Sequence, residues 1–294
     1  MRYSLPILSS AAATKRPFIT ASTLTTSFLI SFMGSLISLA PAQPQRYQSV
    51  VVMRHGERMD NFVESWLSKA ARPWDPPLFD DGHSRSFRTG MELRTQLGYP
   101  IHRVIVSPFL RCVETASEVA SALCAIDENS DAVSGTDVPI DPSKIKASIE
   151  YGLCEMFNNV AIRTPPENKD QWGFKLPEIQ SKLQAGTVDP EYEPVFQKLP
   201  KWGETSSDAR ARYERVIHAL ADKYPSENLL LITHGEGLRA TVSTFLNGTK
   251  IRKVEYCAYV KLQRQVTPKE DNTFTAGKFD VVSHHGYLLR NDDA

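Results

Sequence analysis

The stretch Val50-Val51-Val52-Met53-Arg54-His55-Gly56-Glu57-Arg58 decides the fold of this chain. Its first half is a short, β-branched apolar run, which is typical of a buried strand. A histidine flanked by two arginines follows where that strand ends, beside a glycine that allows the backbone to turn tightly. Ligand sites of open α/β sheets lie outside the carboxyl ends of the strands, so the stretch predicts a site as well as a strand. A neutral imidazole between fixed cations is suited to attack on a phosphoryl group, whose oxygens the guanidinium groups would bind.

Two further segments repeat this pattern of apolar strand, abrupt turn, reactive polar residue and helix: Val104–Arg111 and Leu229–Glu236. Taken singly, a histidine beside a strand is more often a structural residue, and an arginine one turn into a helix is usually a surface group. Loops at the carboxyl ends of neighbouring parallel strands converge in space, however, so we expect one pocket lined by side chains from all three segments. These side chains are Arg54, His55, Arg58, Arg111 and His234.

Strand-like and helix-like segments alternate along the chain, which predicts a mostly parallel sheet covered by helices on both faces. The expected strands are 50–53, 103–106, 144–149, 228–233, 257–262 and 278–282, and the expected helices are 61–71, 82–97, 109–125, 208–224 and 235–246. We therefore predict a single α/β domain over residues 46–290, built as a three-layer α/β/α sandwich. The proline-containing segment 157–202 is predicted to be an insertion over the site.

The composition of the chain excludes several classes of site. Its 294 residues include 34 basic and 34 acidic side chains, and this balance argues against a dedicated nucleic-acid binder. The four cysteines show neither a CxxC pair nor zinc-ligand spacing, which predicts buried free thiols. His284 and His285 are adjacent and would point to opposite faces of a strand, so we predict no metal site there.

Residues 1–45 differ from the rest, because they contain no acidic residue and many serines and threonines. They resemble an organelle transit peptide, or a signal peptide with the apolar run 28–39 and a cleavage site at Ala40-Pro41-Ala42. A start at Met33 would instead create a weak myristoylation pattern. The apolar run is short and contains serines and a glycine, so we predict no stable membrane span. We favour a cytoplasmic location, with organelle targeting and secretion as the alternatives.

Three motifs resemble, in this order, the histidine phosphatase (phosphoglycerate mutase-like) superfamily: Met53–Arg58, Ser107–Ala116 and Thr233–Gly237. More narrowly, segments 65–67, 75–78 and 151–155 are similar to the phosphatase domain of the Sts proteins. The resemblance implies a phosphoglycerate mutase-like fold around a mostly parallel sheet. It does not extend to the ubiquitin-binding and SH3 modules of the Sts proteins.

The resemblance also implies a role for each site residue. His55 would be the nucleophile that forms a phosphohistidine, and His234 would add a donor to the phosphoryl group. Arg54, Arg58 and Arg111 would hold the phosphoryl oxygens. Glu155 would protonate the leaving oxygen and then activate water. An acid of this kind must be protonated in the resting enzyme, so we expect partial burial to raise the pKa of Glu155.

Together these observations predict a metal-independent and cofactor-independent phosphomonoester hydrolase. Its substrate would be a phosphorylated small molecule or a phosphoprotein, and the sequence does not identify which. A phosphoglycerate mutase-type phosphotransferase is one alternative, and a non-catalytic phosphate-binding interaction protein is another. A homodimer is left open.

Overall fold

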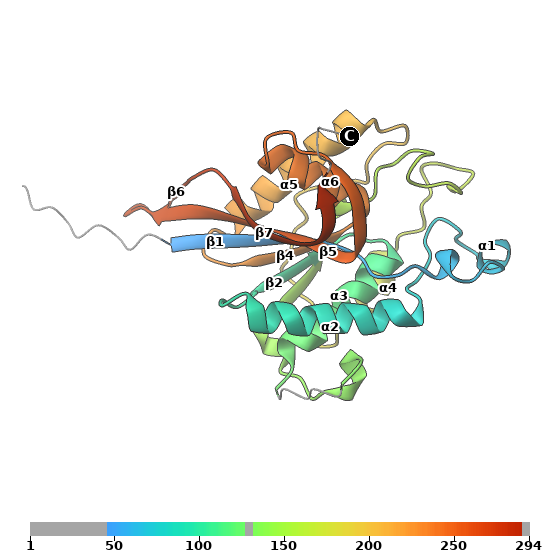
Figure 1. The fold of residues 1–294 in the computed structure, drawn as a ribbon, viewed down its shortest axis with the longest axis horizontal. Helices are drawn as coiled ribbons and strands as arrows, with labels where there is room; N and C mark the ends of the chain where they lie inside the picture. The colour runs from blue at the N-terminus through green and yellow to red at the C-terminus, as the bar shows by residue number, and fades with distance from the viewer. Residues whose placement is uncertain (1–45, 127–131, 290–294) are drawn as a thin grey trace, which may run out of the picture. The chain divides into compact units, whose positions relative to one another are not determined.

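The computed structural model describes residues 46–126 and 132–289 (Figure 1). All of them belong to one compact unit, residues 43–294. The predicted targeting segment 1–45 lies outside the described residues, so its interpretation and the domain boundaries stay predictions. Within the described part of the chain, no helix combines the length and the apolar character needed to cross a bilayer.

A seven-stranded sheet runs through this unit in the order β3-β2-β4-β1-β5-β6, with β7 paired to β5. The parallel part consists of β1 (Arg46–Arg54), β2 (Arg103–Val106), β3 (Lys146–Ile149) and β4 (Leu229–Thr233). The antiparallel part consists of β5 (Ile251–Pro268), β6 (Phe274–Ala276) and β7 (Asp280–Leu289). The register pairs Arg54 with Thr233, so the carboxyl ends of β1 and β4 meet. The predicted α/β fold with a mostly parallel sheet is confirmed.

Helices cover both faces of the sheet (Figure 1). The four long ones are α2 (Asp80–Gln96), α3 (Leu110–Cys124), α5 (Ser206–Lys223) and α6 (Gly235–Phe245). Two short helices, α1 (Trp66–Lys69) and α4 (Leu176–Gln180), lie in the connections. Single 3-10 turns are η1 (Met59–Asn61), η2 (Gly135–Asp137), η3 (Pro142–Lys144) and η4 (Tyr151–Leu153).

The side chains of β1 alternate between the two cores. Val51 and Met53 pack with residues of α2 and α3, whereas Val50 and Val52 pack with residues of α5 and α6. Successive strand residues point to opposite faces, so a strand buried on both sides needs a continuous apolar run. Each aliphatic side chain buried in this way contributes about 1.5–3 kcal/mol. The four cysteines also lie in the interior and are free thiols, as predicted.

Three predicted elements have the wrong extent. The expected helix 61–71 contains only the end of η1 and the four residues of α1. The strand expected at 257–262 is the centre of the much longer β5, and the one expected at 278–282 continues to Leu289 in β7. The extent of β7 was underestimated because exposed polar side chains such as Ser283, His284 and His285 occupy this edge strand, where no apolar run marks the backbone pairing.

Candidate active site

The carboxyl end of β1 presents His55 as an oriented, neutral imidazole. Its backbone N–H donates to the carbonyl of Thr233 on β4 at 3.0 Å. Its Nδ1 lies 2.7 Å from the carbonyl oxygen of Gly56, which can only accept, so Nδ1 carries the proton and Nε2 keeps a free lone pair. Burial and the charges of Arg111 and Arg54 hold the pKa of His55 well below its ordinary value.

Gly56 allows α2 and α3 to approach the end of β1. A Cβ at this position would lie 2.7 Å from the carbonyl oxygen of Gly82 and 2.8 Å from Oγ of Ser86. The N–H of Gly56 donates to Oγ1 of Thr115 on α3 at 3.0 Å. Thr115 lies four residues after Arg111 and therefore on the same face of α3. The sequence analysis did not single out Thr115, although this spacing could have identified it.

Arg54 and Arg58 are held by different contacts. Arg54 donates from Nη1 to the carbonyl of Val254 at 2.6 Å, and its guanidinium carbon lies 4.2 Å from the ring centre of Tyr256. Arg58 makes a two-point contact with the carboxylate of Asp60, at 2.9 and 2.6 Å. Both guanidinium groups are thereby fixed near His55, and an oriented guanidinium group binds a phosphate with little loss of side-chain freedom.

Arg111 and His234 meet in the interior between α3 and the turn from β4 to α6. Nη2 of Arg111 lies 3.1 Å from Nδ1 of His234 and can only donate, so this ring nitrogen accepts. Nε2 of His234 therefore carries the proton and donates to Oγ of Ser107 at 2.9 Å. Burial and the charge of Arg111 keep the pKa of His234 well below its ordinary value. The ring centres of His55 and His234 are 5.5 Å apart, so the predicted side chains of the three segments do lie together.

Three buried guanidinium nitrogens of this cluster have no hydrogen-bond partner among the described residues: Nε of Arg54, and Nε and Nη1 of Arg111. Buried donors are normally satisfied, so this cluster indicates an anion site. Burial lowers the pKa of both side chains, and the neighbouring charge of Arg58 lowers it further. Within the same described residues, no group of three or more His, Cys, Asp or Glu side chains has an arrangement suited to a metal ion.

Glu155 follows η4 and borders the same cluster. Its Oε1 accepts from the N–H of Met156 at 3.1 Å, and its Oε2 lies 3.4 Å from Nδ1 of His234 and 3.8 Å from Nη2 of Arg111. Because this nitrogen of His234 is an acceptor, its closeness to a second acceptor favours a protonated carboxyl group. Burial raises the pKa of Glu155, as the sequence analysis expected.

Arg212 on α5 holds the backbone around Glu155. Its Nη1 donates to the carbonyls of Gly152 at 2.7 Å and Cys154 at 2.9 Å, and its Nη2 donates to the carbonyl of Glu155 at 3.2 Å. The carboxylate of Glu204 binds the same guanidinium group through two contacts of 2.7 Å. The sequence analysis missed Arg212, because no local signal separates it from the other charged residues of this helix.

Tyr256 is a third residue near the site that was not predicted from the sequence. It lies in an irregular part of β5, where the pairing with β7 shifts register between Val254 and Tyr259 and Cys257 has a φ of 56°. The N–H of Cys257 donates to the carbonyl of His55 at 3.2 Å. This irregularity brings the ring of Tyr256 to 6.0 Å from the ring of His55. Because this bulge lies far from His55 in the sequence, the motifs around His55 could not predict it.

A cavity of about 260 Å³ opens beside Arg58 and Arg111. Apolar side chains such as Leu67 and Trp74 form part of its wall, and polar side chains such as Asn61 and Arg163 form the rest. The segment 160–164 closes another side, and its Val160 is 82% exposed. Part of the predicted insertion therefore borders the site.

Comparisons with known proteins show similarity in sequence and in fold. Residues 170–267 match the family model of the histidine phosphatase superfamily (branch 1). The human ubiquitin-associated and SH3 domain-containing protein A is 26% identical over 245 residues, which cover 72% of this chain and 33% of that protein. This chain thus spans about a third of the length of that relative.

A solved structure shows the same fold. The ecdysone phosphate phosphatase from Bombix mori, crystallised in complex with tungstate, superposes with a TM-score of 0.56 at 23% identity, covering 84% of this chain and 96% of that one. This chain is therefore similar to the histidine phosphatase superfamily over residues 170–267, and it shares its fold with this solved structure.

Proposed function

We propose that this chain hydrolyses phosphate monoesters through a phosphohistidine intermediate at His55, without a metal ion. One observation carries the proposal: buried, unpartnered guanidinium donors of Arg54 and Arg111 lie beside a neutral imidazole that has a free Nε2 lone pair. An anion bound by these donors would place its phosphorus next to a nucleophile. Glu155, whose pKa burial raises, borders the same cluster and can supply a proton.

In the first step, Nε2 of His55 attacks phosphorus and the ester P–O bond breaks. The leaving oxygen takes the proton of the Glu155 carboxyl group, which becomes a carboxylate. The arginine cluster binds the non-bridging oxygens and stabilises the negative charge that gathers on them in the transition state. The phosphorylated ring is positively charged, and its Nδ1–H remains bonded to the carbonyl of Gly56.

In the second step, water attacks phosphorus and the P–N bond to His55 breaks. The Glu155 carboxylate takes a proton from this water molecule and is thereby restored to its starting form. Inorganic phosphate leaves, and Nε2 of His55 regains its lone pair. Each turnover thus consumes one ester and one water molecule and releases one alcohol and one phosphate.

The cavity wall favours a leaving group of a particular kind. Leu67, Trp74 and Val160 offer apolar surface next to Arg58 and Arg111. These three side chains gain free energy when they cover an apolar or aromatic alcohol. We therefore propose esters of apolar or aromatic alcohols as the preferred substrates.

The test uses the full chain with p-nitrophenyl phosphate in excess EDTA, comparing wild type with His55→Ala. We expect turnover in the wild type and a fall of at least about a thousandfold in the variant. His284→Ala, a change at an exposed histidine of β7, is the matched control and should keep wild-type activity. Wild-type turnover by a folded His55→Ala protein would refute the mechanism.

Two assays separate the alternative functions. A mutase would transfer phosphate within 3-phosphoglycerate with little net release of phosphate. A non-catalytic binding protein would bind inorganic phosphate in calorimetry and turn over neither substrate. The proposed hydrolase should instead release phosphate faster from 1-naphthyl phosphate than from glycerol 3-phosphate.

A further inference from the structure

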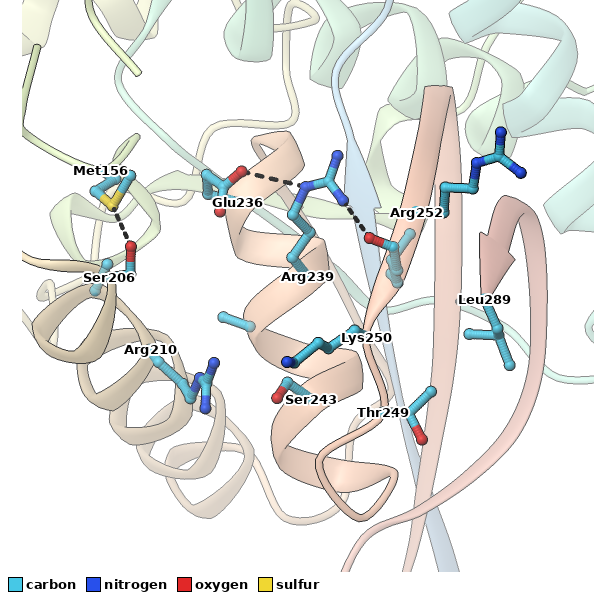
Figure 2. Close-up of a pocket in the computed structure, with 13 residues that line it drawn as sticks. Met156, Ser206, Arg210, Glu236, Arg239, Ser243, Thr249, Lys250, Arg252 and Leu289 are labelled. Carbon is cyan, nitrogen blue, oxygen red and sulfur yellow. Dashed lines mark hydrogen bonds and ion pairs between the residues drawn. The ribbon is translucent and has the colours of Figure 1, made fainter. Parts of the chain in front are cut away.

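A second hollow, of about 760 Å³, lies against α6 on the side that faces α5 (Figure 2). Glu236, Arg239, Ala240 and Ser243 of α6 line it, at the i, i+3, i+4 and i+7 spacing that places side chains on one helix face. The first turns of α5 and the start of β5 form the other walls. Nothing in the proposed hydrolytic reaction uses this hollow.

The turn after α6 builds one wall of the hollow. Asn247 and Gly248 both have positive φ angles, 47° and 77°, which end the helix. The N–H of Gly248 donates to the carbonyl of Ser243 at 2.9 Å, and that of Thr249 to the carbonyl of Leu246, also at 2.9 Å. The chain therefore folds back directly, and Figure 2 shows Thr249 and Lys250 beside α6 as a result.

The charges of the lining residues do not balance. Four cations line the hollow against the single carboxylate of Glu236, and that carboxylate is paired with Nε of Arg239 at 3.2 Å. A further bond of 2.7 Å from Nη1 of Arg239 to the carbonyl of Ile251 fixes this arginine. Arg210 and Lys250 make no ion pair with any described residue, and Figure 2 shows them reaching toward each other over Ser243.

The floor of the hollow is apolar, whereas its rim carries donors. Ala209, Ala240 and Met156 are buried beneath it, and the small alanine side chains make the depression. Ser243 and Thr249 also line the hollow, and their hydroxyl groups make no hydrogen bond with a side chain of the described residues. A site for a phosphorylated organic molecule combines an apolar floor with hydroxyl donors and unpaired cations, and this hollow has all three features.

We propose that this hollow binds a small molecule bearing at least two phosphoryl charges, of the size of a sugar bisphosphate. Arg210 and Lys250 bind the phosphoryl oxygens, and Ser243 and Thr249 add hydrogen bonds. The site is separate from the cluster around His55, and the inference does not rest on the hydrolytic function proposed above. Its inner end is nevertheless close to that cluster, because Glu236 follows His234 by two residues.

The probe for the test is methylenebisphosphonate, whose P–C–P linkage resists hydrolysis, titrated into the full chain by calorimetry. We expect two binding events in the wild type, one at each cluster. In Arg210→Gln/Lys250→Gln, one event should weaken at least about a hundredfold, because two charge-assisted bonds are lost and each is worth at least about 1.4 kcal/mol. Ser243→Asp, which adds a carboxylate inside the hollow, should remove the same event.

Lys146→Gln/Lys269→Gln removes two exposed cations elsewhere and is the matched control, which should keep both events. Flotation with phosphatidylcholine vesicles, with and without phosphatidylinositol bisphosphate, identifies the source of the phosphoryl groups. One supporting outcome is that the wild type binds the vesicles that contain phosphatidylinositol bisphosphate while both hollow variants lose this binding. That result would support the site and identify its ligand as a lipid headgroup. The inference would be overturned if the hollow variants bound both probes as tightly as the wild type does. It would also be overturned if the control variant lost binding to the same extent as the hollow variants.

Discussion

His55 and Glu155 are two titratable groups whose pKa values are moved in opposite directions by the same buried environment. Burial and the neighbouring arginines lower the pKa of His55, so its imidazole is neutral. Burial raises the pKa of Glu155, so a larger fraction of its carboxyl groups is protonated. A neutral nucleophile beside a protonated acid is the pairing that phosphoryl transfer to a histidine requires.

The first prediction concerns the pH dependence that Glu155 imposes. In the wild type, kcat/KM should fall as pH rises through the raised pKa of Glu155, because the carboxylate cannot protonate the leaving oxygen. It should also fall as pH drops through the lowered pKa of His55, because an imidazolium has no lone pair. In Glu155→Gln, the alkaline limb should disappear and kcat/KM for an alkyl phosphate should fall by about 10²–10⁴-fold.

Burst kinetics provide the control for this prediction. p-Nitrophenol leaves without an acid, so Glu155→Gln should still release one equivalent of it rapidly and then turn over slowly, because dephosphorylation lacks its base. An alkaline limb that is unchanged in the variant would assign the acid to another residue.

At the scale of elements, α5 positions Glu155, the proposed acid, although α5 contributes no side chain to the arginine cluster around His55. Arg212 donates to three carbonyls of the segment from Gly152 to Glu155, and Glu204 neutralises its charge. Removing one partner of a buried ion pair leaves the other charge uncompensated, at a cost of about 3–5 kcal/mol. Replacing both partners avoids that cost.

The second prediction uses this difference. Arg212→Met should lower the free energy of unfolding by about 3–5 kcal/mol, whereas Arg212→Met/Glu204→Gln should recover most of the loss. Both proteins should show a lower kcat for an alkyl phosphate, with KM nearly unchanged, because the carbonyls around Glu155 lose their donor. Denaturant unfolding and steady-state kinetics check the two parts. A double variant with wild-type kcat would mean that Arg212 only stabilises the fold.

The parts of the site that could be predicted are those marked by local sequence. His55, Arg111 and His234 each follow an apolar strand at an abrupt turn, and parallel pairing then brings them together. Tyr256 and Arg212 carry no such mark. Tyr256 reaches the site through a register shift in β5. Arg212 reaches it from helix α5, because its side chain donates to the segment that ends at Glu155. Such contacts depend on tertiary packing, which no local pattern records.

At the scale of the whole molecule, the site is electrostatically unfavourable in the free protein. Arg111 is 1% exposed, two of its nitrogens lack a partner, and burial together with the charge of Arg58 lowers its pKa. The surrounding sheet and helices supply the stability that holds these cations together. The buried charge of Arg111 should therefore favour phosphate binding and at the same time lower the stability of the fold.

The third prediction follows from this opposition. Arg111→Met keeps much of the buried volume and removes an incompletely satisfied charge, so without ligand it should raise Tm by about 2–4 °C, equivalent to about 1 kcal/mol. Inorganic phosphate at a hundred times its Kd should stabilise the wild type by about 2.7 kcal/mol and leave Arg111→Met nearly unchanged. The two melting curves should therefore exchange order as phosphate is added. Arg88→Met, at an exposed arginine of α2, should show the wild-type response to phosphate. A lower Tm for Arg111→Met in phosphate-free buffer would mean that Arg111 stabilises the fold in its own right, because the contacts with His234 and Glu155 would then outweigh the burial of its charge.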